Sequence, residues 1–137
     1  MAMCHLAGPA RSRAASAREI AEQYDIPVEL LAKILQKLAR RGFLVSQQGI
    51  HGGYSLARPA DRISLADIIE ATDGPLTVTA CSATDQDCDQ YSKCSVRDPL
   101  WRIKDRIVKA LAASTVAELV RDVAGDTAPV TVALNTR

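Results

Sequence analysis

The sequence lacks several features that would place it in a common class of protein. No apolar run approaches the ~18 residues of a membrane-spanning helix, and the N-terminus has no secretory pattern. There is no Cys-x-x-Cys pair, nucleotide-binding glycine pattern or recognisable nucleophile motif, which argues against a redox carrier, a nucleotide-dependent enzyme and a hydrolase. Internal repeats are also absent. We therefore expect a cytoplasmic protein that is not an enzyme and has no membrane partner.

The composition is that of one ordinary globular domain, with 137 residues of which 47% are hydrophobic and 24% charged. The net charge of +1 conceals an uneven distribution. Residues 1–62 hold nine Lys/Arg and five Asp/Glu, a net +4, whereas residues 63–137 hold eight and eleven, a net −3. A basic first half is typical of a module that binds an anionic partner such as nucleic acid.

Two helices joined by a tight turn are expected in the first third of the chain. Ser16 and Glu19 form a capping-box pattern, which marks the start of the first helix. Asp25 suits the left-handed turn position that follows this helix. Pro27 suits the first turn of the second helix, which ends before Gly42. The second helix has apolar residues at helical spacing, namely Val28, Leu31, Ile34, Leu35 and Leu38. The pattern predicts a helix-turn-helix unit in which the small Ala21 lies where the helices approach and the inward contacts come from Ile20, Tyr24, Ile26, Leu31 and Ile34.

The outer face of the second helix carries the residue types of a recognition helix, although any amphipathic surface helix has a polar face. Lys and Gln can bond base edges in the major groove, and Lys and Arg can contact phosphates. A strand over Phe43–Ser46, a glycine-containing turn and a returning strand over Tyr54–Ala57 follow directly, which predicts a winged helix. The glycines at 49, 52 and 53 would let the wing approach a phosphate backbone closely. The predicted DNA-binding residues are Ser16, Arg18, Glu29, Ala32, Lys33, Gln36, Lys37, Arg40, Gln48, His51, Gly52, Gly53, Tyr54 and Arg58.

Three of the four cysteines, Cys81, Cys88 and Cys94, lie in one polar segment with the spacing Cys-x6-Cys-x5-Cys. The segment has no helical or strand period and little apolar surface to bury, so a bound group is needed to order it. Three thiolates converging on a metal ion or an iron–sulfur cluster would do so, whereas three cysteines in a disulfide framework would leave one unpaired. A structural zinc ion, a thiol redox loop and an exposed loop with incidental cysteines remain alternatives.

A helix beginning at Pro99 carries a single apolar stripe, which predicts either burial in its own core or a two-fold dimer seam. The stripe consists of Leu100, Ile103, Ile107, Val108 and Leu111. Thr115 and Glu118 form another capping box, which predicts a short final helix. From Gly125 onward the sequence has no clear period and is expected to be a mobile tail.

The stretch Arg-Arg-Gly-Phe-Leu-Val through His-Gly-Gly-Tyr-Ser-Leu-Ala-Arg-Pro, residues 40–59, resembles the IscR/NsrR/RirA family of bacterial winged-helix regulators, known as the Rrf family. The similarity extends over about residues 1–123 and includes the three-cysteine loop and a helix capped by Ser64 and Asp67. The subgroup it most resembles regulates the SUF iron–sulfur assembly genes. The resemblance implies a mostly α fold with a small β-hairpin wing. It divides the chain into a winged helix-turn-helix DNA-binding domain (1–75), a cysteine-rich cluster-binding loop (76–98), a dimerisation helix and C-terminal helix (99–123), and a flexible tail (124–137).

The resemblance further implies a homodimeric repressor that binds a roughly palindromic operator in double-stranded DNA. It implies a two-iron or four-iron cluster held by Cys81, Cys88 and Cys94. Arg97 stands where IscR-like members have a histidine ligand, so the fourth ligand is left open among Asp87, Asp89, Asp98, a small thiol, water and a partner-chain residue.

The first helix is shorter than in family members, and we expect the true start to lie upstream. Cys4 is then expected to be a core cysteine packed on that helix, rather than a fourth ligand.

Overall fold

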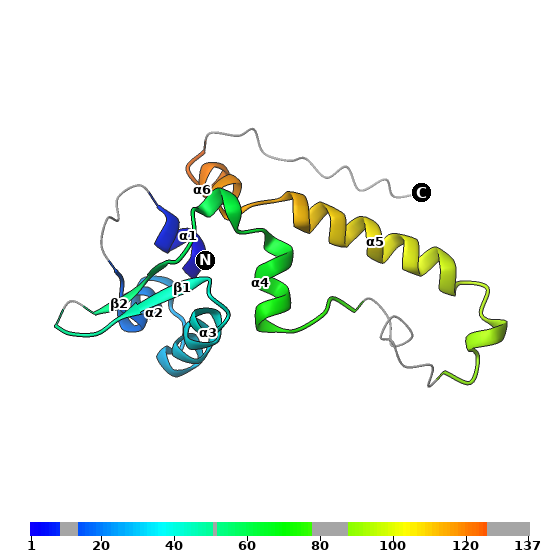
Figure 1. The fold of residues 1–137 in the computed structure, drawn as a ribbon, viewed down its shortest axis with the longest axis horizontal. Coiled ribbons are helices and arrows are strands. Elements are labelled where there is room, and N and C mark those ends of the chain that lie inside the picture. The colour runs from blue at the N-terminus through cyan, green and yellow to red at the C-terminus, as the bar shows by residue number, and fades with distance from the viewer. Residues whose placement is uncertain (9–13, 51, 78–87, 126–137) are drawn as a thin grey trace.

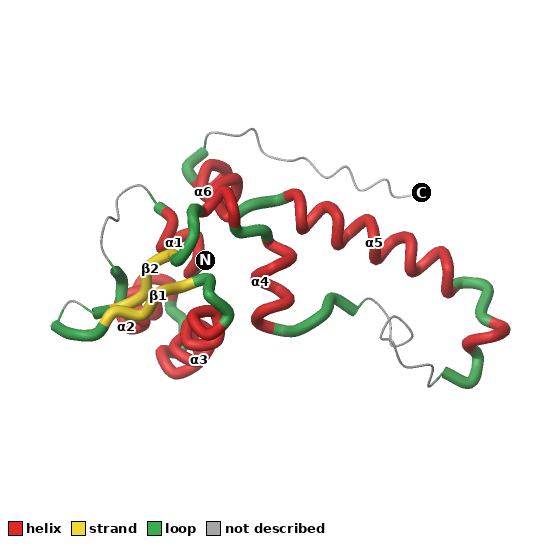
Figure 2. Tube along the Cα trace, in the orientation of Figure 1, coloured by secondary structure: helices red, strands yellow, loops and turns green. Residues whose placement is uncertain are grey.

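The computed structural model describes residues 1–8, 14–50, 52–77 and 88–125 (Figure 1). In these residues the chain is mostly helical, with one two-stranded antiparallel hairpin, as the sequence predicted (Figure 2). A head at one end contains most of the short elements, and the long helix α5 extends away from it. The elements are α1 (Ala2–Ala7), α2 (Ala17–Tyr24), α3 (Val28–Arg40), β1 (Leu44–Gln47), β2 (Gly53–Leu56), the 3₁₀ turn η1 (Ala60–Arg62), α4 (Leu65–Thr72), the 3₁₀ turn η3 (Tyr91–Lys93), α5 (Arg97–Ala113) and α6 (Val116–Val123).

The helix-turn-helix consists of α2 and α3, whose ends follow from the local sequence. The Glu19 amide donates to Ser16 Oγ at 3.1 Å and the Ser16 amide to Glu19 Oε2 at 2.7 Å, which completes the expected capping box. Asp25 takes the left-handed conformation between the helices, with φ 52° and ψ 43°. Gly42 has φ 77° after the end of α3. Pro27 is the residue just before α3 and not, as expected, part of its first turn.

The hairpin pairs Leu44 with Leu56 and Gln47 with Gly53, so each strand is shifted by one residue from the prediction. The reason lies in Phe43, which is 7% exposed and whose amide donates to the Leu38 carbonyl at 3.0 Å. This hydrogen bond caps the C-terminus of α3, which ends at Arg40. Phe43 therefore belongs to the turn after the helix, and the first strand begins one residue later.

The core of the head lies where α2 and α3 meet α1, η1 and α6. Its fully buried large side chains are Ile20, Leu35, Leu38, Ile63 and Val116. Most of the inward contacts predicted for the helix-turn-helix belong to this cluster or pack against it. Val28, the first residue of the apolar spacing in α3, is 41% exposed.

The residues at the start of α4 and at the start of α6 are hydrogen-bonded to each other. The Leu65 amide donates to the Ser114 carbonyl at 2.9 Å, and the Val116 amide donates to the Ile63 carbonyl at 3.0 Å. The predicted capping boxes at Ser64 and Thr115 are both present and begin α4 and α6. Ile63, which precedes α4, and Val116, which begins α6, are therefore held side by side in the buried core.

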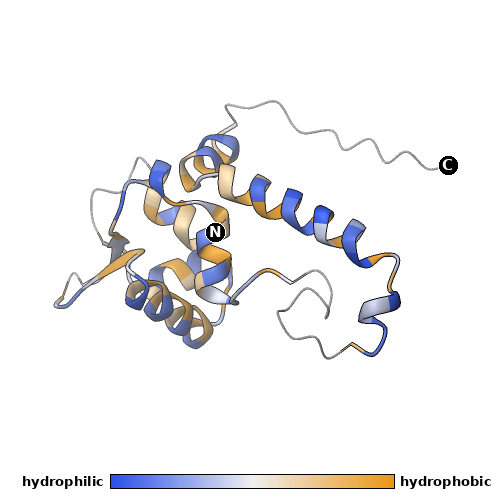
Figure 3. Ribbon diagram, turned by 45° about the vertical axis from the view of Figure 1, so that its right-hand side comes forward, coloured by the Kyte–Doolittle hydropathy of each residue, from blue (hydrophilic) through white to orange (hydrophobic). Residues whose placement is uncertain are grey.

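The helix α5 begins at Arg97, two residues before the expected start at Pro99. Pro99 lies in the first turn, where its missing amide would have had no intrahelical partner. None of the residues of α5 is buried, and its apolar side chains alternate with polar ones along its length (Figure 3). Ile103 is 46% and Ile107 39% exposed. Among the described helices, none is long and apolar enough to cross a membrane.

Candidate DNA-binding surface and cysteine segment

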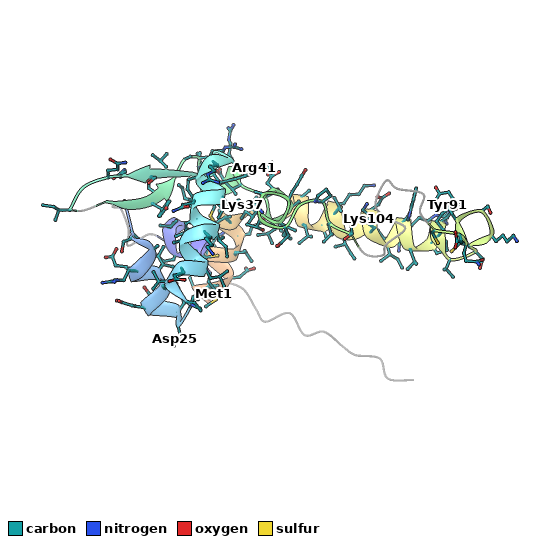
Figure 4. The ribbon with its side chains drawn as sticks, turned by 90° about the horizontal axis from the view of Figure 1, so that it is seen from below. Met1, Asp25, Lys37, Arg41, Tyr91 and Lys104 are labelled. Carbon is teal, nitrogen blue, oxygen red and sulfur yellow. The ribbon has the colours of Figure 1, made fainter. Side chains whose placement is uncertain are left out.

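The exposed face of α3 presents most of the residues predicted to read DNA. Lys33, Gln36 and Arg40 are exposed, as is Glu29, whereas Ala32 is half-buried. Figure 4 looks directly onto α3 and shows the hairpin beside it, so both elements are accessible from one side of the head. A recognition helix and a wing on one side can contact a groove and the adjacent backbone together.

Lys37 is also exposed on α3, but its ammonium group has a partner within the chain. Lys37 Nζ donates to the carbonyl of Thr72, the last residue of α4. The bond joins the recognition helix to the end of α4, which precedes the cysteine segment in sequence. Lys37 therefore connects two elements of this chain in addition to its predicted role at DNA.

The fold itself requires glycine at several positions of the wing, for reasons that could not be read from the sequence. A Cβ atom on Gly53 would lie 2.5 Å from the backbone of Ala15, and one on Gly52 would lie 2.5 Å from the Gln47 carbonyl oxygen. Gly49, with φ 114° and open space around it, is the one that permits the turn itself. Close packing thus accounts for Gly52 and Gly53 without DNA. His51, also predicted to contact DNA, lies outside the described residues.

Some of the other residues predicted to contact DNA already make contacts within the chain. Tyr54 is half-buried and its backbone exchanges two hydrogen bonds with Ala15, at 3.0 and 2.8 Å. The Arg58 guanidinium lies 4.9 Å from the centre of the Phe43 ring. The Ser16 hydroxyl caps α2. Arg18, Gln48 and Arg58 are exposed, so they are the accessible groups of this set.

Sequence reasoning did not single out two exposed apolar side chains on this side of the head. Leu30 on α3 is 53% exposed, and Ile50 at the wing is 99% exposed. Leu30 was not singled out because it lies within an apolar run of the sequence, and Ile50 was not because its neighbours in the sequence are mostly polar. An exposed apolar side chain on a helix in the major groove can contact a thymine methyl group.

The cysteine segment is described only from Cys88 onward, so Cys81 and Asp87 lie outside the described residues. Cys88 is exposed and Cys94 half-buried, and they flank the turn η3. In the part of the chain that the structure describes, no group of three or more His, Cys, Asp or Glu side chains is placed to hold a metal ion. The predicted set of three thiols includes Cys81, so this finding does not test it. The two described thiols, neither of which is in a disulfide, are of the ligand type that a thiolate-ligated cluster uses.

Arg97, at the position of the expected histidine ligand, makes several contacts near these cysteines. Its Nε lies 2.7 Å from Asp98 Oδ1, and its Nη1 donates to the Tyr91 carbonyl at 3.2 Å. Its guanidinium lies 4.6 Å from the centre of the Tyr91 ring. The hydrogen bond from Arg97 lowers the pKa of Asp98 below its usual value. Asp98 is thus already paired with a cation.

Cys4 lies on α1 in the head, and Figure 1 places α1 and the turn η3 at opposite ends of the molecule. Cys4 is half-buried and is not one of the buried core residues, so the expected core position was wrong. Within one chain, Cys4 is remote from Cys88 and Cys94.

The chain is similar to proteins of one family along most of its length. The profile of the Rrf2 family, described as an iron-dependent transcriptional regulator, matches residues 1–122. The protein rrf2 of Nitratidesulfovibrio vulgaris is 29% identical over 107 residues, covering 78% of this chain and 71% of that protein.

Two solved structures have the same fold. CymR, the global cysteine regulator of B. subtilis, has a TM-score of 0.69 and 25% identity, over 88% of each chain. IscR of T. potens has a TM-score of 0.69 and 27% identity, over 93% of this chain and 85% of that one. With its helix-turn-helix, wing and extended α5, this chain therefore belongs to the Rrf2 family of transcriptional regulators.

Proposed function

We propose that this protein is a homodimeric DNA-binding repressor that senses iron–sulfur cluster status in the cytoplasm and controls cluster-assembly genes of the SUF type. The observation that carries the proposal is the exposed polar face of α3, with Lys33, Gln36 and Arg40, in a chain of an iron-dependent regulator family. The cysteine segment supports the sensing role, because Cys88 and Cys94 flank one turn at the far end of the molecule.

DNA reading would use α3 in the major groove and the wing at the neighbouring backbone. Lys33 and Gln36 have the donors that base edges accept, and Arg40 has the charge that phosphates attract. Arg18 and Gln48, both exposed, are available for backbone contacts. The leucine at position 30 adds an apolar group that could contact a thymine methyl.

Dimerisation would cover the apolar stripe of α5. Ile103 and Ile107 are 46% and 39% exposed in the single chain, and Trp101 is 40% exposed. A two-fold pairing of α5 with its copy buries the same patch on both chains. The two heads would then meet two half-sites of a roughly palindromic operator.

Cys81, Cys88 and Cys94 would hold the cluster. Soft thiolates suit iron–sulfur ligation, whereas the guanidinium of Arg97 cannot ligate. When bound, the cluster supplies a centre that oxidants, nitric oxide or iron shortage can change or remove. The remaining ligand would come from Asp87, Asp89, a small thiol, water or the partner chain.

Sensing would be a matter of linkage, in which cluster binding and DNA binding favour one arrangement of the dimer and so alter each other's equilibrium. One described contact supports such a linkage. The end of α4 precedes the cysteine segment, and its Thr72 carbonyl accepts a hydrogen bond from Lys37 of α3. A displacement of the end of α4 would therefore act on the recognition helix.

The test is purification without oxygen, with the visible spectrum recorded alongside the iron, sulfide and zinc content. Iron matched by sulfide, with charge-transfer bands that are lost on changing Cys81, Cys88 or Cys94 to Ala, is the expected result. Mapping the operator would then show whether the regulated genes are those of iron–sulfur assembly. Zinc alone, or no metal, would contradict cluster sensing and leave a winged-helix regulator.

The alternative is a regulator that works through its thiols without a cluster. CymR, a global cysteine regulator, has the same TM-score to this chain as IscR, so the fold is compatible with either possibility. It predicts that DNA affinity changes with the oxidation state of Cys88 and Cys94 in metal-free protein. Binding measured with and without a thiol reductant separates the two.

A further inference from the structure

The turn between Cys88 and Cys94 is joined to α5 through two residues, Tyr91 and Arg97. The Tyr91 amide donates to the Cys88 carbonyl at 2.9 Å. The Tyr91 carbonyl accepts from Arg97 Nη1 at 3.2 Å, and the guanidinium lies 4.6 Å from the centre of the Tyr91 ring. A continuous series of contacts therefore leads from the backbone of one cysteine to the first turn of α5.

The stability of α5 does not explain why an arginine stands at its first position. The positive end of the helix dipole lies there, so it favours Asp98 and opposes Arg97. The Arg97 side chain is nevertheless only 27% exposed, against 62% for Asp98. A planar guanidinium can bond a carboxylate and a carbonyl and stack on a ring at once, which neither lysine nor histidine can do.

We propose that Arg97 is a positioning residue that holds the Cys88–Cys94 turn against α5 in the metal-free protein and keeps Asp98 out of the ligand set. The part about Asp98 as a ligand rests on the proposed cluster function, whereas the part about Arg97 holding the turn is independent of it. Arg97 thus stands where a histidine ligand was expected, and it holds the turn in place without binding the metal. We call these contacts of Arg97 the clamp. The two thiols are presented by a turn that is ordered before a metal arrives, which reduces the ordering cost of binding.

Amide hydrogen exchange in the metal-free full-length protein tests the clamp. The amides of Tyr91 and Lys93, which bond the Cys88 and Gln90 carbonyls, report on the turn directly. We expect R97Q to exchange these amides about threefold to fivefold faster, the range of a partly exposed ion pair. R97K keeps the charge but cannot make the three contacts together, so it should behave like R97Q.

The matched control is R106Q, because Arg106 is exposed on the same helix and its loss should leave both amides unchanged. The head lies at the other end of α5, so its circular-dichroism melting should be the same in all variants. Unchanged exchange in R97Q and R97K would overturn the clamp, and full protection in R97K would show that charge alone is sufficient.

Cobalt(II), added without oxygen as a spectroscopic probe, tests the ligand set. D98N should bind it with the same thiolate-to-cobalt absorption bands as the unaltered protein, because Asp98 is held by Arg97. Altered bands in D98N would show that Asp98 ligates and would overturn this part of the inference. If no thiolate bands form in any variant, the proposed cluster site fails, while the exchange result still decides the clamp.

Discussion

The head and the α5 arm use similar apolar patterns but reach opposite degrees of burial. In the head, Leu31, Leu35 and Leu38 of α3 are at most 3% exposed. In α5, which also carries a periodic apolar stripe, no residue is buried. Helical periodicity therefore identifies a face that must be covered, but it does not identify what covers it. The head covers its faces by itself, whereas the arm needs a second surface.

The largest effect should come from breaking the core of the head. Leu35 is 0% exposed, so L35A should lower the free energy of unfolding by about 2–5 kcal/mol, through lost burial and the cavity left behind. Urea denaturation followed by circular dichroism measures this. The control is A112G on the exposed side of α5, which should lower the free energy of unfolding much less. Equal losses in the two variants would contradict the contrast between head and arm.

The next effect should appear in the arm without unfolding the head. Replacing Ile103 and Ile107 by Asp puts charges into the proposed dimer seam, and should raise the dimer dissociation constant by about 30-fold or more. Sedimentation velocity measures the change, and R106A on the same helix is the control. A dimer that persists unchanged would show that the stripe is not the seam.

Within the head, the exposed face of α3 should govern sequence choice. K33A or Q36A should weaken binding to operator DNA by about 1–3 kcal/mol, and should weaken binding to unrelated DNA less. Fluorescence anisotropy at one fixed salt concentration measures both affinities. K109A, at an exposed position of α5, should change neither. Equal losses on both DNAs would place the two side chains on phosphates.

The smallest effect should come from breaking the hydrogen bond between α3 and α4. K37M removes the bond to the Thr72 carbonyl and should reduce the coupling between cluster loading and DNA affinity by about 0.5–2 kcal/mol. R40M, on the same helix, should weaken DNA binding while the coupling is kept. The measurement is the ratio of DNA affinities of loaded and metal-free protein. An unchanged ratio in K37M would remove Lys37 from the connection.

Local elements were predictable because their signals are local. The capping boxes at Ser16, Ser64 and Thr115 each begin a helix, since the side chain and the amide that it caps are only three residues apart. The errors arose where a residue had two competing roles. Phe43 was assigned to a strand, but its amide completes α3, and Pro99 was taken as a helix start although the helix begins at Arg97.

The candidate surfaces were predictable as residue types but not as contacts. Lys33 and Gln36 lie on the exposed face of α3 as expected, because helical spacing places them opposite the buried leucines. The partner of Lys37 is 35 residues away, and no pattern in the sequence brings Thr72 to it. The need for glycine at position 53 likewise comes from Ala15, a residue distant in sequence.

The sequence by itself determined the helix-turn-helix, the hairpin and the thiol segment, because capping, turn conformation and apolar period act over a few residues. Only the tertiary structure decided what those elements meet. It joined Ile63 to Val116 at the base of the arm, left Ile103 and Ile107 of α5 exposed, and used Arg97 to hold the turn beside Cys94. These outcomes depend on contacts between residues far apart in the chain, whose free energy is set by packing and by the loss of chain entropy on bringing them together.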